Sequence, residues 1–247
     1  MAQDLTELHA FVTGGSRGIG EAIVRRLAAD GARVTFTYNA SEPAATALVT
    51  SVAEAGGVAT AVKVDSADQD ALRAAIRDSA AANGRLDILV NNAGVGVFAP
   101  IETLTAEDYD RVVGINLGAV FHASQEALGL MKSGGRIINI GSVNAERNPL
   151  PGASIYALSK AGVAGFTGAL AREVSARGIT VNTVQPGPVA TELNPAVGPF
   201  ADLLNPHIAA GRYGEVEEVA ALVAYLSGPE AAYITGASIN IDGGFTA

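Results

Sequence analysis

Tyr156 and Lys160 stand four residues apart in this chain, and side chains of these two types at this spacing could transfer a proton. On a helix, side chains four residues apart lie on one face, so the phenol and the ammonium would be neighbours. An ordinary tyrosine has a pKa of about 10, and a positive charge a few Å away lowers that pKa by favouring the phenolate. The pair therefore predicts an acid–base group that works near neutral pH. Such a pair also occurs by chance on helices that carry out no chemistry.

Two further polar residues could serve the same reaction. Ser142 follows the strand-like run 135–141, where its hydroxyl could bind the same substrate oxygen as Tyr156. Asn116 stands among apolar neighbours in a long predicted helix over 105–131, and a buried amide needs hydrogen-bond partners. Its amide either satisfies backbone groups or takes part in the site. Together these residues favour proton transfer at a carbonyl or an alcohol.

A glycine-rich turn lies near the start of the chain, between a short apolar run at 9–13 and a helical pattern at 18–27. A strand, a glycine turn and a helix start together hold a pyrophosphate, because backbone N–H groups and the positive end of the helix dipole face the anion. Gly14 would permit the tight turn, Gly18 would let the phosphates approach, and Gly20 would let the helix pack on its strand. The spacing is not G-x-G-x-x-G, and ordinary tight connections also use such glycines.

The second predicted strand, 32–38, ends without the acidic residue that binds the ribose 2′-hydroxyl in NAD-binding folds. Asn39 and Ser41 stand there instead, and Arg17 in the glycine turn could reach the same region. A guanidinium with amide and hydroxyl groups suits a 2′-phosphate. We therefore predict NADP(H) rather than NAD(H), with a solvated turn residue as the alternative interpretation of Arg17.

Composition narrows the classes of protein. Hydrophobic residues make up 49% of the 247, which is enough for the core of one large domain. The net charge of −9 argues against nucleic acid as a partner, since binding to phosphate backbones needs clustered Lys and Arg. The chain has no Cys, and its three His residues lack metal-ligand spacing, so we expect no metal site. Residues 1–10 do not resemble a signal peptide, and no apolar run reaches the ~18 residues of a membrane span. We expect a soluble, cytoplasmic protein.

Strand and helix patterns alternate along the whole chain. This order predicts an α/β fold: a single-domain, Rossmann-type, doubly wound parallel sheet of about seven strands with helices on both faces. With no linker in the sequence, we expect residues 1–247 to form one NAD(P)-binding domain with a small substrate lid around 192–213. In such sheets ligands bind beyond the carboxyl ends of the strands. The residues that fall there are Thr13, Asp65, Asn91, Ser142 and Pro186.

Glycines recur every three residues in the predicted helix that carries Tyr156, at Gly162, Gly165 and Gly168. Each costs about 1 kcal/mol relative to Ala in a helix. We therefore expect close packing of this helix, either against the sheet or against a second subunit.

Taken in order, these residues resemble the short-chain dehydrogenase/reductase family over essentially the whole chain. The resemblance is carried by the T-G-x-x-x-G-I-G turn at 13–20, Asp65, the Asn-Asn-Ala-Gly run at 91–94, Asn116, Ser142, Tyr156-x-x-x-Lys160, Pro186-Gly187, and the runs 233–236 and 242–244. Within the family, the chain is most similar to the 3-oxoacyl-[acyl-carrier-protein] reductase-like branch, through Gly-Gly-Ser-Arg-Gly-Ile-Gly in the turn and the runs 171–174 and 210–214.

The resemblance implies a role for each predicted catalytic residue. Tyr156 would be the general acid in reduction and the base in oxidation, and Ser142 would hold the substrate oxygen. Lys160 would lower the Tyr156 pKa and bind the nicotinamide ribose. Asn116 would hold, through its helix backbone, a water that relays protons. The loop 143–150 would line the substrate pocket.

Cofactor contacts follow from the same resemblance. Asp65 would contact the adenine, Asn91 the adenosine ribose region, and Val189 and Thr191 the nicotinamide carboxamide. The full set of predicted cofactor-binding residues is Gly14, Ser16, Arg17, Gly18, Ile19, Gly20, Asn39, Ser41, Asp65, Ser66, Asn92, Ala93, Gly94, Tyr156, Lys160, Pro186, Gly187, Val189 and Thr191.

The predicted function is that of an NADPH-dependent ketoreductase, with a 3-oxoacyl thioester as one candidate substrate. The alternatives are an NAD-dependent alcohol, sugar or steroid dehydrogenase, and a dinucleotide-binding regulator without turnover. An acidic carrier protein would dock on basic residues, for which Arg172 and Arg177 are candidates on an otherwise acidic chain. We expect a small-molecule carbonyl or alcohol substrate, no nucleic-acid or membrane partner, and a homotetramer, which is usual in the family.

Overall fold

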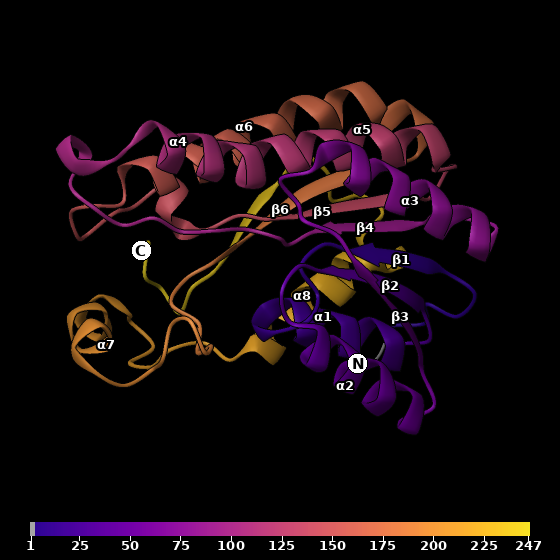
Figure 1. The fold of residues 1–247 in the computed structure, drawn as a ribbon, viewed down its shortest axis with the longest axis horizontal. Coiled ribbons are helices and arrows are strands. Elements are labelled where there is room, and N and C mark those ends of the chain that lie inside the picture. The colour runs from indigo at the N-terminus through magenta and orange to yellow at the C-terminus, as the bar shows by residue number, and fades with distance from the viewer. Residues whose placement is uncertain (1–2) are drawn as a thin grey trace.

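Seven strands form one parallel sheet in the order β3-β2-β1-β4-β5-β6-β7 (Figure 1). The structure, a computed structural model, describes residues 3–247; the first two residues of the predicted domain lie outside the described residues. From β1 the chain moves outward to β3 on one side, and it then returns to β4 and moves outward to β7 on the other. This order confirms the doubly wound fold. The strands are β1 (His9–Val12), β2 (Arg33–Tyr38), β3 (Val58–Lys63), β4 (Ile88–Asn91), β5 (Arg136–Ile140), β6 (Thr180–Pro186) and β7 (Ser238–Ile241).

Helices cover both faces of the sheet (Figure 1). One layer holds α1 (Gly18–Ala29), α2 (Glu42–Glu54) and α8 (Val216–Ser227), and the other holds α3 (Gln69–Asn83), α4 (Ala106–Val113), α5 (Ala119–Leu130) and α6 (Ser154–Val174). Each layer has its own apolar core against the sheet. The strands β4, β5 and β6 are buried along their whole length, as expected of parallel strands between two helical layers.

The predicted single helix over 105–131 is interrupted. It consists of α4, a π-helix over Gly114–Gly118, and α5. Thr105 begins α4 with a capping box, in which its Oγ1 accepts from Asp108 N at 3.1 Å and Asp108 Oδ2 accepts from Thr105 N at 3.0 Å. A π-helical turn inside a helix is frequently found at functional sites, and this one contains Asn116.

The three glycines of α6 do not all pack as predicted. A Cβ built on Gly162 would lie 2.8 Å from Leu117 Cδ2, so this glycine lets α6 approach the π-helix closely. A Cβ built on Gly165 or Gly168 would meet no atom within 4 Å. Packing on the sheet therefore explains neither of these two, and packing against a second subunit stays a prediction.

The segment predicted as a lid, residues 192–213, contains the short helix α7 (Pro199–Leu204). Leu204 and Ile208 form a buried cluster with Val143, which directly follows the predicted catalytic serine. Helix α7 stands apart from both helical layers (Figure 1). The segment therefore has the position of a lid, and its motion on substrate binding stays a prediction.

Across residues 3–247 the helices are all too short or too polar to span a bilayer. The same residues hold no group of three or more His, Asp or Glu side chains placed to bind a metal ion. The cytoplasmic location stays a prediction.

Candidate functional site

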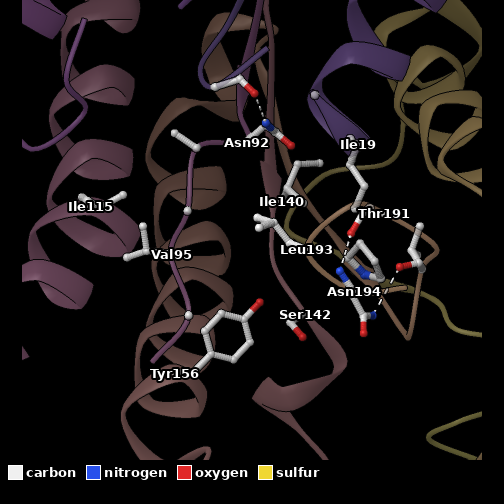
Figure 2. A pocket seen from close by; sticks show the side chains of 18 of the residues that line it. Ile19, Asn92, Val95, Ile115, Ile140, Ser142, Tyr156, Thr191, Leu193 and Asn194 are labelled. Atoms are coloured by element: carbon white, nitrogen blue, oxygen red, sulfur yellow. Dashed lines mark hydrogen bonds between the residues drawn. The ribbon is translucent and has the colours of Figure 1, made fainter. Parts of the chain in front are cut away.

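A cleft of about 1180 Å³ follows the carboxyl ends of β1 to β6. Every residue of the full predicted cofactor-binding set, which includes Tyr156 and Lys160, lines this cleft, and so does Ser142. Asn116 and Asn91 do not line it. Figure 2 shows Tyr156, Ser142 and residues of the lid segment around the same cavity. The structure therefore brings the predicted residues together, and their contacts with a bound cofactor stay predictions.

The glycine turn after β1 has the backbone that an anion-binding loop needs. Gly14 and Gly18 have φ of +65° and +55°, in the left-handed region that glycine adopts without strain. Asn92, at the end of β4, fixes the turn: its Nδ2 donates to Thr13 O at 3.0 Å and to Gly14 O at 2.9 Å. The hydroxyl of Thr13 in turn accepts from Ala93 N at 2.9 Å. The conformation of the turn is thus fixed by hydrogen bonds within the protein.

Gly20 is required by the turn itself rather than by the packing of α1 on its strand. A Cβ at this position would lie 2.3 Å from Gly14 O and 2.5 Å from Asn92 Nδ2. A Cβ on Gly15 would lie 2.6 Å from Phe36 Cβ in β2 and 3.0 Å from Val24 Cγ2 in α1, so Gly15 lets the turn pack closely against both elements. The role predicted for Gly20 is therefore corrected: it protects the contact between Asn92 and the glycine turn.

The role predicted for Asn91 is also wrong. Its side chain is buried in the sheet, where Nδ2 donates to Asn139 Oδ1 at 2.8 Å and to Ser124 Oγ at 3.1 Å. Neighbouring residues of a strand point to opposite faces, so Asn91 faces α5 while the next residue reaches the cleft. Asn91 therefore belongs to the interior of the protein and not to the adenosine end of the cleft.

The end of the cleft near β2 is open and uncharged apart from one arginine and one aspartate. Arg17 and Asn39 are exposed, and Ser41 begins α2 without using its side chain as a cap. Asp65 lines the same end, with its Oδ1 accepting from Ala67 N at 2.9 Å. Residues 38–41 contain no carboxylate. This set of groups fits a phosphorylated ribose better than a free 2′-hydroxyl.

Tyr156 and Lys160 lie one turn apart on α6, as predicted from their spacing. Lys160 Nζ is 5.6 Å from the centre of the Tyr156 ring and donates to Ile140 O at 2.8 Å. Gly94 lies in the loop after β4, and a Cβ built on it would lie 3.6 Å from Lys160 Nζ. Because glycine has no side chain, Gly94 leaves this side of the ammonium uncovered. An ammonium has three N–H donors, which leaves two for groups in the cleft.

The predicted direction of the Tyr156 pKa shift is wrong in this structure. Burial raises the pKa of the Tyr156 phenol, and a hydrogen bond with Ser142 lowers it by less. Burial also lowers the pKa of Lys160 to about 8. Burial of the charged form is the largest cause of both shifts. Tyr156 therefore keeps its proton at neutral pH, as an ordinary phenol does, and in this structure it is a weaker acid than an ordinary phenol.

Lys160 gives the stability of the protein a pH dependence that can be measured. Its pKa is about 8 in the folded protein and about 10.5 when exposed, so between these values the unfolded chain binds more protons and stability rises with pH. Below pH 8 the folded protein carries the full cost of the buried ammonium. We expect the unfolding free energy of the wild type, relative to Lys160→Met, to rise by about 2 kcal/mol between about pH 7.5 and 9.5. Urea titrations at both pH values measure this difference. The exposed Lys132→Met serves as the control, and parallel pH curves for wild type and Lys160→Met would contradict the assignment.

The side chain of Asn116 is hydrogen-bonded to the backbone of the loop after β4. Its Oδ1 accepts from Val95 N and its Nδ2 donates to Val95 O, both at 2.9 Å. Nδ2 also donates to Ser159 Oγ at 2.9 Å, and this hydroxyl donates to Tyr156 O at 2.7 Å. Asn116 thus satisfies backbone groups, which was one of its two predicted uses, and joins the β4 loop to the turn that carries Tyr156. The water held through its backbone stays a prediction.

The part of the cleft beyond Tyr156 is mostly apolar. The ring of Phe98 lies 5.3 Å from the Tyr156 ring, tilted by 46°. From the predicted substrate loop, the lining residues are Val143, Asn144, Pro149 and Leu150, whereas residues 145–148 do not line the cleft. Leu193 and Phe200 contribute from the lid segment. This composition suits a carbonyl compound with apolar substituents.

Several lining residues carry no motif and were missed from sequence, among them Val95, Phe98, Ile115 and Phe245. Each stands close in sequence to a residue that was predicted. Val95 and Phe98 follow the Asn-Asn-Ala-Gly run, and Ile115 precedes Asn116. Phe245 follows the glycines after β7. Closeness in sequence to a predicted residue was therefore the signal that could have identified these lining residues.

The chain is similar to known proteins over nearly its full length. A family model described as "Enoyl-(Acyl carrier protein) reductase" matches residues 14–246. The cyclic-di-GMP-binding biofilm dispersal mediator protein of Escherichia coli K12 is 52% identical over 237 residues, which is 96% of each chain. A 3-oxoacyl-[acyl-carrier-protein] reductase of Synechocystis is 41% identical over 243 residues, which is 97% of each chain.

Solved structures match over nearly the full length as well. A short-chain dehydrogenase/reductase from Serratia marcescens BCRC 10948 is 56% identical with a TM-score of 0.97, covering 99% of this chain and 100% of that one. A short-chain dehydrogenase from Burkholderia cenocepacia J2315, solved in complex with NADP, is 48% identical with a TM-score of 0.97 and the same coverage. The similarity therefore spans the glycine turn, the predicted catalytic residues and the lid segment.

Proposed function

The chain belongs to the short-chain dehydrogenase/reductase family, and from this premise we propose that it is an NADP(H)-dependent ketoreductase. It transfers a hydride between NADP(H) and a carbonyl or secondary alcohol. The observation that carries the proposal is the convergence of Ser142, Tyr156 and Lys160 in one cleft with the glycine turn. This arrangement puts a proton donor within the same cavity as a pyrophosphate-binding loop, as reduction of a ketone by a dinucleotide requires.

In this mechanism the carbonyl oxygen accepts hydrogen bonds from the hydroxyls of Ser142 and Tyr156. Bound NADPH supplies the hydride. The Tyr156 phenol carries a proton at neutral pH and donates it as negative charge develops on the substrate oxygen, because an alkoxide is a stronger base than a phenolate. The ammonium of Lys160, one helical turn away, then stabilises the phenolate, and its remaining N–H groups bind ribose hydroxyls.

The residues present fit NADP(H). Gly14 and Gly18 expose backbone N–H groups to a pyrophosphate, and the free hydroxyl of Ser41 and the guanidinium of Arg17 suit a 2′-phosphate. The Burkholderia cenocepacia relative, 48% identical, was solved with NADP. NADP(H) is therefore the cofactor that we assign to the chain.

Arg17 should distinguish the two nicotinamide cofactors. We expect Arg17→Ala to raise the dissociation constant for NADPH about 10-fold, because a charge-assisted hydrogen bond to phosphate is lost from an exposed site. The dissociation constant for NADH should change little, because NADH has no phosphate there. Fluorescence titration of both cofactors measures this. Arg25→Ala is the matched control, since Arg25 lies on α1, which begins directly after Arg17, but binds Glu21 and Ser51. Equal weakening of NADPH and NADH by Arg17→Ala would contradict the assignment.

Initial rates on a panel of substrates test the function itself. The panel contains acetoacetyl thioesters, diketones and quinones, each measured with NADPH and with NADH, and sugars and steroid alcohols, each measured with NADP⁺ and with NAD⁺. We expect ketone or thioester reduction with a preference for NADPH. Equal rates, or a preference for NADH, would overturn the cofactor assignment, and oxidation of sugars or steroid alcohols with NAD⁺ alone would favour the alternative dehydrogenases.

A 3-oxoacyl thioester stays one candidate substrate, in keeping with the Synechocystis relative named as a reductase of this kind. Of the two basic residues considered for docking a carrier protein, Arg177 donates Nη2 to Leu128 O at 2.6 Å and is thereby engaged in the fold. Arg172 is exposed and stays available. A carrier protein would therefore depend on Arg172 more than on Arg177.

A second candidate function is the binding of cyclic di-GMP, which the name of the Escherichia coli relative suggests. A regulator that only binds a dinucleotide needs no proton donor, yet Ser142, Tyr156 and Lys160 are all present in this chain. Calorimetric titration with cyclic di-GMP, alone and with NADPH, separates the two. Saturable binding together with no turnover on the whole panel would favour this second candidate.

We further propose that the protein is a cytoplasmic homotetramer. Phe121 on α5 is 46% exposed, and the open face of α6 carries Gly165 and Gly168. These features suit a helix pair that packs on a second copy of the chain. Light scattering during size exclusion gives the mass of the assembly, and a monomer would contradict the proposal.

A further inference from the structure

The chain folds back on itself after β7, next to the cleft. Asp242 Oδ1 accepts from Gly244 N at 3.0 Å, and Oδ2 accepts from Thr246 N at 2.9 Å and from Thr246 Oγ1 at 2.7 Å. Gly243 and Gly244 have φ of +60° and +79°, which this tight turn requires. Figure 1 shows the C-terminal end of the chain in the region between α4 and α7. The hydrogen bonds of this turn therefore fix the position of Phe245, although it lies near the end of the chain.

Phe245 is 3% exposed and lines the cleft. It belongs to the buried cluster that also holds Val143, adjacent to Ser142, and Leu204 and Ile208 of the lid segment. The ring therefore lies where the serine-bearing loop meets the lid segment. A phenyl ring has no proton to transfer, so its effect on a substrate is through shape.

Arg147 holds this ring from the serine-bearing loop. Its Nη1 donates to Phe245 O, and its guanidinium carbon lies 5.6 Å from the centre of the Phe245 ring. The backbone of Arg147 donates to Val143 O at 2.9 Å, which fixes the arginine to the turn that follows Ser142. Arg147 itself does not line the cleft. It is therefore placed to act on a substrate only through Phe245.

The lid segment is tied to the same turn. Ala210 N donates to Gly243 O at 2.8 Å, and the rings of His207 and Phe245 are 6.3 Å apart with an edge-to-face geometry. Phe245 thus contacts both walls of the substrate part of the cleft. Movement or loss of its ring would enlarge the cleft without touching Tyr156 or Lys160.

We propose that Phe245 is a specificity-determining residue, and Arg147 its positioning residue, which together close the end of the substrate cleft against ketones with bulky substituents. This inference rests on the proposed ketoreductase function. In a hydrophobic pocket, one methylene changes discrimination by about 10- to 200-fold, so the difference between a phenyl ring and a smaller side chain should be measurable.

The test compares kcat/KM for a small methyl ketone with kcat/KM for an aryl ketone in several variants. We expect the aryl-to-small ratio to rise about 10-fold in Phe245→Leu and in Arg147→Ala, mainly through a lower KM for the aryl ketone. Arg147→Lys should restore a ratio close to the wild type, because it keeps a cation near Phe245 O. For the small ketone, kcat/KM should change less than it does for the aryl ketone, because a small substituent does not reach the space that the substitution opens.

Phe11→Leu is the matched control, because Phe11 is fully buried in β1 and does not line the cleft. A ratio that stays at the wild-type value in folded Phe245→Leu, or that rises equally in Phe11→Leu, would overturn the inference while leaving the ketoreductase function intact. If Phe245→Leu does not fold, the aryl-to-small ratio of kcat/KM, measured in Arg147→Ala and in Arg147→Lys, tests the inference instead. Absence of ketone reduction by the wild-type protein would instead overturn the proposed function.

Discussion

Replacing Tyr156 by Phe should lower kcat for ketone reduction by about 10²- to 10⁴-fold, the range expected when a positioned general acid is removed. The substitution deletes one hydroxyl and keeps the ring. The contacts of that ring with Phe98, at 5.3 Å, and with the Lys160 ammonium, at 5.6 Å, should therefore survive. Because the walls of the cleft keep their shape, the dissociation constant for NADPH should stay within about 2-fold of the wild type, a difference of roughly 0.4 kcal/mol.

Steady-state rates and fluorescence titration of NADPH on the same samples measure the two quantities. Tyr109→Phe is the matched control, since Tyr109 is 49% exposed on α4 and does not line the cleft. It should leave both quantities unchanged. If Tyr156→Phe reduces ketones at the wild-type rate, another group supplies the proton and the mechanism is wrong. If it loses NADPH binding together with turnover, the hydroxyl has a structural role that the geometry does not show.

The fold was predictable because hydrophobic runs and helical patterns alternate without a break. The strands predicted at 9–13, 32–38 and 135–141 are observed as β1, β2 and β5, with ends that differ by at most about one residue. The interruption of the helix over 105–131 was not predictable. It depends on the hydrogen bonds between Asn116 and Val95, which stand 21 residues apart in sequence, and on the approach of Leu117 to Gly162. Local patterns carry no information about such distant partners.

The predicted site residues gathered in one cleft because motif residues stand at strand ends, which the topology brings together. The direction in which the Asn91 side chain points was not predictable. Neighbouring residues of a strand point to opposite faces, so an error of one residue in the predicted strand end decides whether a side chain is buried or reaches the cleft. The pKa of Tyr156 was also beyond the sequence. The spacing to Lys160 showed that the charge would be near, but the depth of burial, which determines the sign of the shift, depends on the packed structure.

Replacing Gly20 by Ala should raise the dissociation constant for NADPH by at least about 10-fold and destabilise the protein by about 1–3 kcal/mol, the usual cost of overpacking. The new Cβ would lie 2.3 Å from Gly14 O and 2.5 Å from Asn92 Nδ2. Either the start of α1 moves away or the hydrogen bond from Asn92 to Gly14 O, at 2.9 Å, breaks. Both responses would displace the backbone N–H groups that we predict to face the pyrophosphate.

Gly129→Ala is the control that separates this effect from the general effect of alanine in a helix. Gly129 is exposed near the end of α5, and a Cβ there would meet no atom within 4 Å. Since alanine is the better helix former, this variant should be more stable than the wild type by about 0.5–1 kcal/mol and should bind NADPH as the wild type does. The same substitution should thus change stability in opposite directions at the two positions. Titration of NADPH and urea unfolding on both variants measure the contrast. Wild-type affinity in Gly20→Ala would show that the turn tolerates the displacement and that the contact between Asn92 and Gly14 does not set the geometry of the phosphate site.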